Sequence, residues 1–298
     1  MNYVTEQSAK SALVCIALMV LIVGAVFPLN GAAAKKDELD LYIAPKTEFL
    51  PVGELLAHLL ESRLALEVNK KIQYLDIGLR KTANGQGDLF IGLKLPMTRK
   101  VSWDYSLYQL CDLGPIYEDV ISGFATPAYV PEGELDSAED LADSNIKARL
   151  HNEIIVYGFD ESLREESKKL VSGMKELQDY KLVELGEMVA NSELSRAIRN
   201  KEWIVTTLKR PSIPFSLNDL RFIEELTEEQ SVHLFGRRSL MEDYSSKVTQ
   251  FLSRFYLSIE LVDELVRMRD ADKASAVRNF VDKHPALVKY WLEGVTAL

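Results

Sequence analysis

The arrangement of apolar residues constrains this fold most, because it alternates between the period of a strand and the period of a helix. A strand is predicted at 39–45, a helix at 50–64 and a buried strand at 88–93. Further strands are predicted at 120–130 and 145–150, and after residue 238 only helices are predicted. Such alternation predicts an α/β fold built on a mainly parallel sheet.

The first 34 residues have the pattern of an export signal. Lys10 closes a short polar start, residues 11–26 are almost entirely apolar, and Ala32 to Ala34 are the small residues that a signal peptidase requires. We therefore expect a signal peptide at 1–34, cleavage near Ala34 and a periplasmic mature protein. The alternative is an uncleaved membrane anchor, although the apolar run is short for a span of about 20 residues.

Charge and cysteine content exclude several classes of function. The chain carries a formal net charge of −10, and since residues 1–34 contain one Lys and one Glu, the remainder also carries −10. Nucleic acid and anionic membranes are poor partners for such a surface. Only Cys111 remains after the predicted cleavage, which excludes an internal disulfide. We expect no metal site, because the histidines lack metal-ligand spacing. We also expect a monomer with no cofactor.

The chain is long enough for two lobes. If it leaves one lobe near Gly123 to Pro127 and returns near Val232 to Gly236, the lobes are joined by two crossings. The predicted first lobe comprises residues 35–125 plus 233–298, and the predicted second lobe comprises 126–232. This architecture predicts a ligand in the cleft between the lobes.

Five segments resemble, in sequence and in order, the glycine betaine, proline betaine and choline binding proteins of ABC importers. The most specific motifs are G-D-x-x-x-x-x-x-L-P-x-T at Gly87 to Thr98, G-P-x-Y-E at Gly114 to Glu118, and H-P-x-L-V-x-x-W-L at His284 to Leu292. The resemblance covers nearly all of the chain after residue 34. The segments are 44–62, 83–100, 113–130, 204–215 and 251–294.

The resemblance implies an α/β, two-lobed periplasmic binding protein fold (type II, Venus flytrap) and a binding protein rather than an enzyme. Such proteins close on a small solute and deliver it to an ABC permease in the inner membrane, which works with its ATPase. The pocket of this family is an aromatic cage, in which ring faces hold a quaternary ammonium by cation–π attraction.

At the cage positions this sequence departs from the family pattern. The motif W-T-[DE] reads Lys46-Thr47-Glu48, W-L-P-x-T begins at Lys94, and the tryptophan of T-L-W-x-P-H-W is Lys209. Tyr117 keeps an aromatic ring, and Arg149 lies in the segment that replaces the family loop G-x-D-P-G-A-G. The candidate ligand-binding residues are therefore Lys46, Glu48, Lys94, Tyr117, Arg149 and Lys209.

Three converging lysines would repel a trimethylammonium group, because one like-charge contact at about 4 Å costs roughly 4 kcal/mol at an effective dielectric near 20. A carboxylate, sulfonate or phosphate would be attracted instead. We therefore expect an anionic solute, and lysine repulsion that holds an empty cleft open. The alternatives are lysines that are ordinary surface groups, a ligand sensor or protein-interaction receptor without transport, and catalysis through a Lys209 Schiff base.

Overall fold

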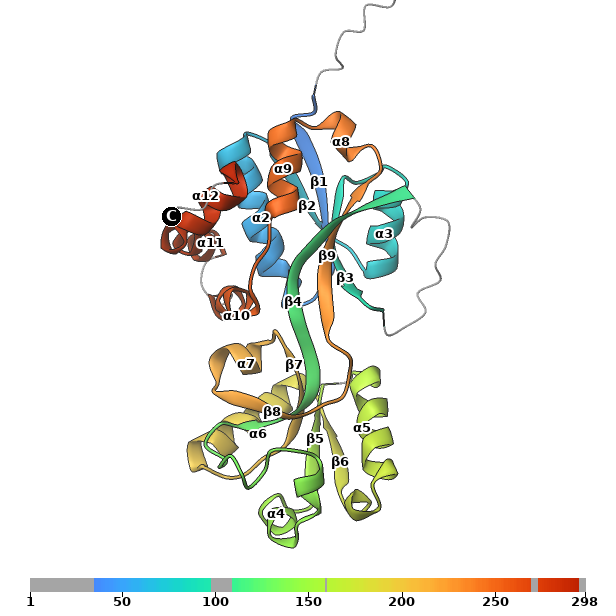
Figure 1. The fold of residues 1–298 in the computed structure, drawn as a ribbon, viewed down its shortest axis with the longest axis vertical. Helices are drawn as coiled ribbons and strands as arrows, with labels where there is room; N and C mark the ends of the chain where they lie inside the picture. Colours follow the sequence, from blue (N-terminus) through green and yellow to red (C-terminus); the bar gives the residue numbers. More distant parts are fainter. Residues whose placement is uncertain (1–34, 98–108, 159, 269–272, 295–298) are drawn as a thin grey trace, which may run out of the picture. The chain divides into compact units, whose positions relative to one another are not determined.

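The computed structural model describes residues 35–97, 109–158, 160–268 and 273–294, and Asp37–Leu298 forms one compact unit. Strands and helices alternate through most of it, as predicted (Figure 1). The strands are β1 (Glu38–Ile43), β2 (Glu67–Ile72), β3 (Leu89–Leu95), β4 (Leu110–Pro127), β5 (Glu153–Tyr157), β6 (Lys181–Leu185), β7 (Thr206–Arg210), β8 (Leu220–Glu225) and β9 (Gln230–Arg237).

Helices cover the strands and, among the described residues, are the only regular elements after β9. The described α-helices are α2 (Phe49–Leu64), α3 (Leu75–Ala83), α4 (Ser144–Arg149), α5 (Glu161–Gly173), α6 (Glu187–Asn200), α7 (Ile213–Leu217), α8 (Leu240–Asp243), α9 (Ser246–Arg254), α10 (Ile259–Arg267), α11 (Lys273–Lys283) and α12 (Pro285–Glu293).

The strands pair in the order β2-β1-β3-β9-β4-β7-β5-β6, with β8 also paired to β4. Strand β1 is parallel to β2 and β3, and β5 is parallel to β6 and β7, whereas β4 and β9 run antiparallel to their neighbours. The α/β class is confirmed, but the sheet is mixed rather than mainly parallel. The reason is that the two connecting strands, β4 and β9, run in opposite directions through its centre.

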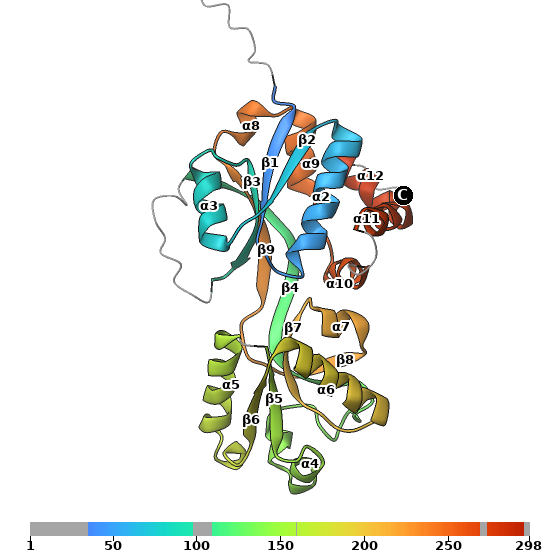
Figure 2. The same ribbon diagram turned by 180° about the vertical axis from the view of Figure 1, so that it is seen from behind.

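Lobe I consists of β1, β2, β3, β9 and the first part of β4, with α2, α3 and α8 to α12. Helices α2 and α3 lie on opposite sides of its strands in both views (Figures 1 and 2). Gly53 of α2 lets this helix approach β1, because a Cβ there would overlap the Ile43 side chain. The core of lobe I extends into the last helices, where Phe280 and Trp291 are fully buried.

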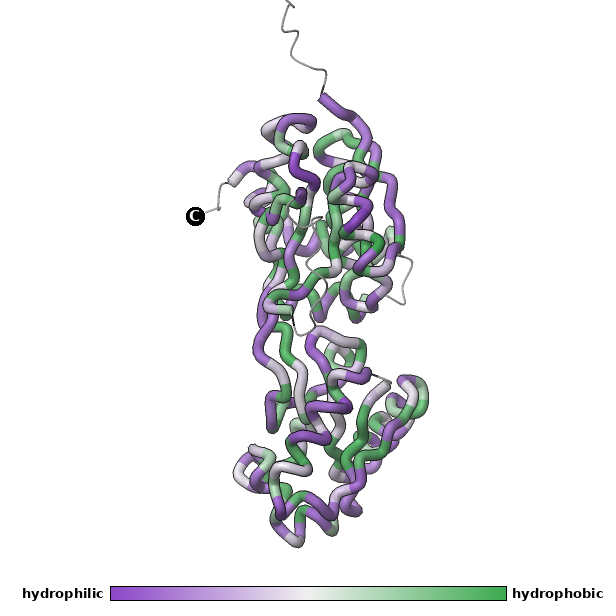
Figure 3. The backbone as a smooth tube through the Cα atoms, turned by 90° about the vertical axis from the view of Figure 1, so that its right-hand side faces the viewer, coloured by the Kyte–Doolittle hydropathy of each residue, from purple (hydrophilic) through white to green (hydrophobic). Residues whose placement is uncertain are grey.

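Lobe II consists of β5 to β8 and the end of β4, with α4 to α7. Helices α5 and α6 flank its strands in both views. Its buried residues form two hydrophobic clusters, around Phe124 and around Leu194, that are separate from the core of lobe I. Along the chain, hydrophobic stretches recur in both lobes between hydrophilic ones (Figure 3). Each lobe therefore has its own hydrophobic core.

Strand β4 belongs to both lobes. Its residues up to Val120 pair with β9, and from Ile121 onward they pair with β7. At Gly123 the strand passes so close to β8 that a Cβ would overlap the Glu224 carbonyl oxygen. Since β9 begins at Gln230, opposite Val120, the chain returns to lobe I beside the point where it left.

One predicted strand is wrong. Residues 145–150 were expected to be extended, but they lie almost entirely in α4, and the strand follows at β5. The Asp143 carboxylate starts this helix by accepting hydrogen bonds from the backbone N–H groups of Asn145 (2.7 Å) and Ile146 (3.2 Å). A local cap therefore outweighed the alternating pattern that suggested a strand.

The predicted signal peptide at 1–34 lies outside the described residues, as does Thr98 at the end of the second cage motif. In the ranges that the structure describes, no helix combines the length and the apolar character that crossing a bilayer would take.

Candidate ligand-binding site

Lys46 lies in the turn between β1 and α2, and its side chain is exposed. Its carbonyl oxygen accepts hydrogen bonds from the N–H groups of Phe49 (3.2 Å) and Leu50 (3.3 Å), which fixes the backbone at the start of the helix. Among the described residues, no carboxylate forms an ion pair with the Lys46 ammonium. This lysine is therefore a free positive charge at the carboxyl end of β1.

Glu48 and Lys94 form an ion pair within lobe I. The Lys94 ammonium donates to Glu48 Oε1 at 3.1 Å, and it lies 5.6 Å from the ring centroid of Phe49. The Thr47 hydroxyl donates to Glu48 Oε2 at 3.3 Å. Burial raises the pKa of Glu48, but Lys94, the Glu48 backbone N–H and, more weakly, Lys209 outweigh this effect and lower it overall. The carboxylate is therefore ionised at neutral pH.

Tyr117 lies in β4 and is completely buried. Its hydroxyl has no hydrogen-bond partner among the described residues, although the hydroxyls of other buried tyrosines, such as Tyr180, do. Burial and, to a smaller extent, the Glu48 carboxylate raise the pKa of Tyr117 well above its ordinary value. The hydroxyl is thus a neutral, unsatisfied donor near Glu48.

Lys209 lies near the end of β7 in lobe II and forms an ion pair with Asp160. Asp160 begins α5, where its carboxylate accepts a hydrogen bond from the backbone N–H of Leu163 at 3.1 Å. Burial raises the pKa of Asp160, but Lys209, the Leu163 N–H and, more weakly, Lys46 together lower it. Asp160 was not predicted as a site residue, although an aspartate just before a charged helix is a recognisable cap signal.

Charges of opposite sign in the two lobes act on each other. Lys209 of lobe II lowers the pKa of Glu48 in lobe I, and Lys46 of lobe I lowers the pKa of Asp160 in lobe II. Each carboxylate thus has a lysine partner in its own lobe and feels a second lysine in the other lobe. The expected repulsion among lysines alone is therefore offset by two carboxylates.

Arg149 is not brought to this cluster. It ends α4, before the amino end of β5, whereas Asp160 follows the carboxyl end of that strand. Its guanidinium pairs with Glu134 at 3.1 Å and lies 4.4 Å from the Trp203 ring centroid. Its contacts are therefore those of a half-exposed residue at the far edge of lobe II.

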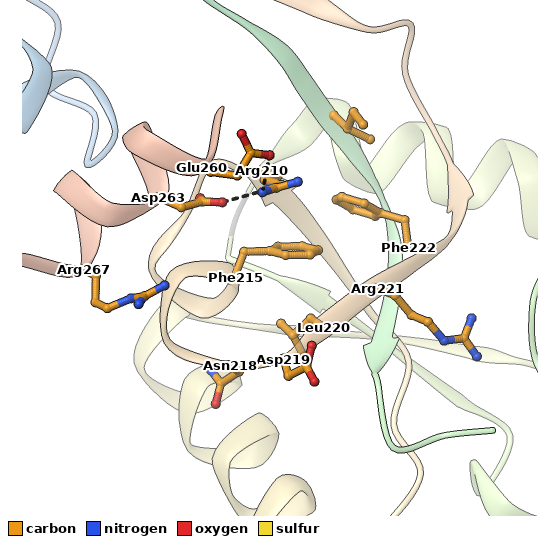
Figure 4. A pocket seen from close by; sticks show the side chains of 11 residues that line it. Arg210, Phe215, Asn218, Asp219, Leu220, Arg221, Phe222, Glu260, Asp263 and Arg267 are labelled. Atoms are coloured by element: carbon orange, nitrogen blue, oxygen red, sulfur yellow. Dashed lines mark hydrogen bonds and ion pairs between the residues drawn. The ribbon is translucent and has the colours of Figure 1, made fainter. Parts of the chain in front are cut away.

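On the other side of β7 from Lys209, Arg210 joins the two lobes. Its Nε donates to Asp263 of α10 at 2.8 Å, and its Nη2 donates to Glu260 Oε1 at 3.4 Å (Figure 4). Arg267 of α10 also donates to the Ser216 carbonyl oxygen of α7 at 2.6 Å. These groups border a cavity of about 410 Å³ that also includes Phe215 and Phe222. The cavity is separate from the lysine cluster and lacks an excess of either charge.

A Ser–His–Asp arrangement also occurs in lobe I. His233 Nε2 lies 2.9 Å from the Ser231 hydroxyl, and its Nδ1 lies 2.9 Å from the Asp112 carboxylate. The Ser231 hydroxyl is also 3.3 Å from the Leu95 carbonyl oxygen. These bonds connect β9 to β4 and β3. The residues do not line the cavity at Arg210 or a second cavity beside Leu170 of α5. We therefore interpret the arrangement as a structural link.

A family model for the substrate binding domain of ABC-type glycine betaine transport systems (OpuAC) matches residues 43–283. The protein belongs to this family. It is therefore a member of a group of substrate-binding components of ABC importers, which are non-enzymatic carriers found in the periplasm or outside the cell. Proteins of this family bind small ligands and dock to a permease. A search of curated proteins gave no significant match.

Several solved structures share the fold. Lactococcal OpuAC, closed around glycine betaine, is 20% identical, with a TM-score of 0.65 over 87% of this chain and 100% of that chain. ProX of Borrelia burgdorferi is 21% identical, with a TM-score of 0.61 over 86% and 96%. A choline binding protein in complex with choline is 18% identical, with a TM-score of 0.61 over 86% and 93%. These matches confirm the two-lobed periplasmic binding protein fold.

Proposed function

We propose that this protein is the exported receptor of an ABC importer and that it binds a small anionic solute between its lobes rather than a quaternary ammonium. The main support is the position of Lys46, Lys94 and Lys209. Lys46 follows β1, Lys94 lies near the end of β3, and Lys209 lies near the end of β7 in lobe II. Lysines of each lobe act electrostatically on a carboxylate of the other. A solute that contacts both sets would favour the closed form.

The same cluster is poorly suited to a trimethylammonium group. Such a group forms no classical hydrogen bonds and needs ring faces, yet the Phe49 ring already has the Lys94 ammonium near it. An additional cation would also meet a cluster in which three ammonium groups outnumber two carboxylates, and a like-charge contact costs about 4 kcal/mol at about 4 Å. An anion gains charge-assisted hydrogen bonds from the same groups.

We propose that a signal peptide at 1–34 is removed near Ala34, and that the monomeric receptor then docks to a permease with its ATPase. The predicted lobe boundaries, with 126–232 as the second lobe, stay a prediction. The contribution of Arg149 to binding also stays a prediction. Its half-exposed ion pair with Glu134 does not support a role in ligand binding.

Equilibrium binding tests this function. The mature protein is titrated with glycine betaine, choline and a panel of carboxylates, sulfonates and phosphonates. We expect an anion to bind, and we expect Lys94→Ala and Lys209→Ala each to weaken its binding by at least about tenfold, which is 1.4 kcal/mol. Lys169→Ala, a change at an 81% exposed side chain in α5, is the control and should have no effect. Tight betaine binding that survives both cleft substitutions would refute the proposal.

A further inference from the structure

We propose that the cleft selects a solute with a single net negative charge, and that Glu48 and Asp160 are the residues that set this limit. The inference rests on the proposed function, because it specifies the class of anion that the same site accepts. It adds Asp160 to the candidate site, and it distinguishes a monoanion from the polyanions that three lysines alone would favour.

The balance of charges in the cluster is the first support. Three lysines, Lys46, Lys94 and Lys209, face two carboxylates, Glu48 and Asp160, so three positive charges minus two negative charges leave +1. Lys94 and Lys209 each have a carboxylate partner in their own lobe. Lys46 alone has none among the residues that the structure describes. One negative charge on the solute would therefore neutralise the cluster.

The two carboxylates are held in place, so they cannot turn away from a second negative charge. Glu48 is 7% exposed and accepts from Lys94 and Thr47, at the first turn of α2. Asp160 is fixed by Lys209 and by the Leu163 N–H at the start of α5. The pKa values of both carboxyls are lowered, so both stay ionised at neutral pH. A dianion would place its second charge against one of them.

Among the residues that the structure describes, the charged groups next to Lys209 and Asp160 do not change this balance. Arg210 is next to Lys209, but successive side chains of a strand point to opposite faces, and Arg210 pairs with Asp263 and Glu260. Glu161 is next to Asp160 and lies 3.9 Å from Arg164. These groups are balanced by partners of opposite sign outside the cluster.

The Tyr117 hydroxyl gives an independent indication of a ligand. It is completely buried near Glu48, and no described group accepts its hydrogen bond. Buried hydroxyls without a partner are uncommon because they lose their bonds to water. An oxygen of the solute would satisfy this donor. A carboxylate oxygen of the monoanion would be that acceptor.

The experiment is a calorimetric titration at neutral pH with propanoate, succinate and tricarballylate, which carry one, two and three negative charges on similar short carbon chains. The wild-type protein is expected to prefer propanoate to succinate by at least about tenfold. Asp160→Asn and Glu48→Gln each raise the charge of the cluster by one, so each should shift the preference toward succinate. Lys46→Gln removes the uncompensated charge and should weaken propanoate binding most.

Asp143→Asn is the matched control. Asp143 caps α4 as Asp160 caps α5, but it lies away from the cluster, and asparagine is as good a cap as aspartate. It should leave the preference unchanged. If the wild-type protein prefers succinate or tricarballylate, the inference fails while the proposed function stands. If no anion binds and betaine does, the proposed function itself fails. Thermal melts show whether each variant is folded before it is titrated.

Discussion

At the scale of single residues, Tyr117 separates stability from binding. Tyr117→Phe removes a buried hydroxyl that has no described partner, so the ligand-free protein should be as stable as the wild type or more stable, by up to about 1–3 kcal/mol. Anion binding should weaken by about tenfold, because the donor is lost. Urea unfolding and calorimetry measure the two effects. Tyr180→Phe is the contrast, since its hydroxyl donates to the Leu141 carbonyl oxygen and its loss should destabilise.

The Glu48–Lys94 pair should make stability depend on pH. Because the pKa of Glu48 is lowered on folding, the stability that it contributes is present above its ordinary value of 4.5 and is lost as the pH falls below 4.5. Glu48→Gln should therefore cost about 1–3 kcal/mol at about pH 7 and much less at about pH 3. Urea unfolding of both proteins across this range measures the difference. A constant difference would show that Glu48 titrates normally.

The sequence indicated part of this site. Comparison with the family motifs selected Glu48 and Lys94, which the structure brings together, and Lys209, which acts on Glu48 from the other lobe. It did not select Asp160, because that residue becomes relevant only when β5 and β7 lie side by side, which brings it to Lys209, 49 positions further along the chain. Arg149 was selected by aligning a segment whose sequence differs from the family loop. The spacing within that segment does not determine which end of β5 the residue lies near.

At the scale of secondary-structure elements, the contact that the end of β7 and helix α7 make with α10 is expected to stabilise the arrangement of the lobes. Arg210→Met should lower the free energy of unfolding by about 1–3 kcal/mol, because Asp263 is buried and would lose its counter-charge. Burial raises the pKa of Asp263 even though Arg210 is present. Amide exchange should increase in both helices.

Arg196→Met is the control for Arg210, since its guanidinium makes exposed pairs with Glu193 of α6 and with Glu202, just after this helix. Such exposed pairs contribute about 0–1 kcal/mol. Adding Asp263→Asn to Arg210→Met should recover part of the loss, which a double-mutant cycle measures. Equal stability of the Arg210 and Arg196 variants would contradict the role given to this contact.

Elements with a strong local pattern were predictable, whereas those decided by distant contacts were not. Helix α2 begins only one residue before its predicted start. Its regular apolar spacing is what made it predictable. Strand β8 was not predicted, since it depends on pairing with β4, and residues 145–150 were assigned to a strand although Asp143 caps a helix there.

At the scale of the whole molecule, salt should act on the empty protein. Attraction between Lys46 and Asp160 and between Glu48 and Lys209 favours approach of the lobes. Raising the salt concentration from about 0.05 M to about 1 M shortens the screening length to about 3 Å. Small-angle scattering should therefore show a larger radius of gyration at high salt and a smaller one after propanoate is added. Asp160→Asn should respond less to salt. A radius that decreases with salt would instead indicate that repulsion dominates.

Because β4 and β9 border the whole of lobe II, the lobe I sheet is assembled from pieces made early and late in synthesis. Strand β9 pairs with both β3 and β4, yet more than a hundred residues of other structure are translated between β4 and β9. The nascent chain therefore cannot complete that sheet, or bury the apolar face that the last helices cover, until almost all of it has been made. A protein truncated before β9 should remain open to proteases in its first half.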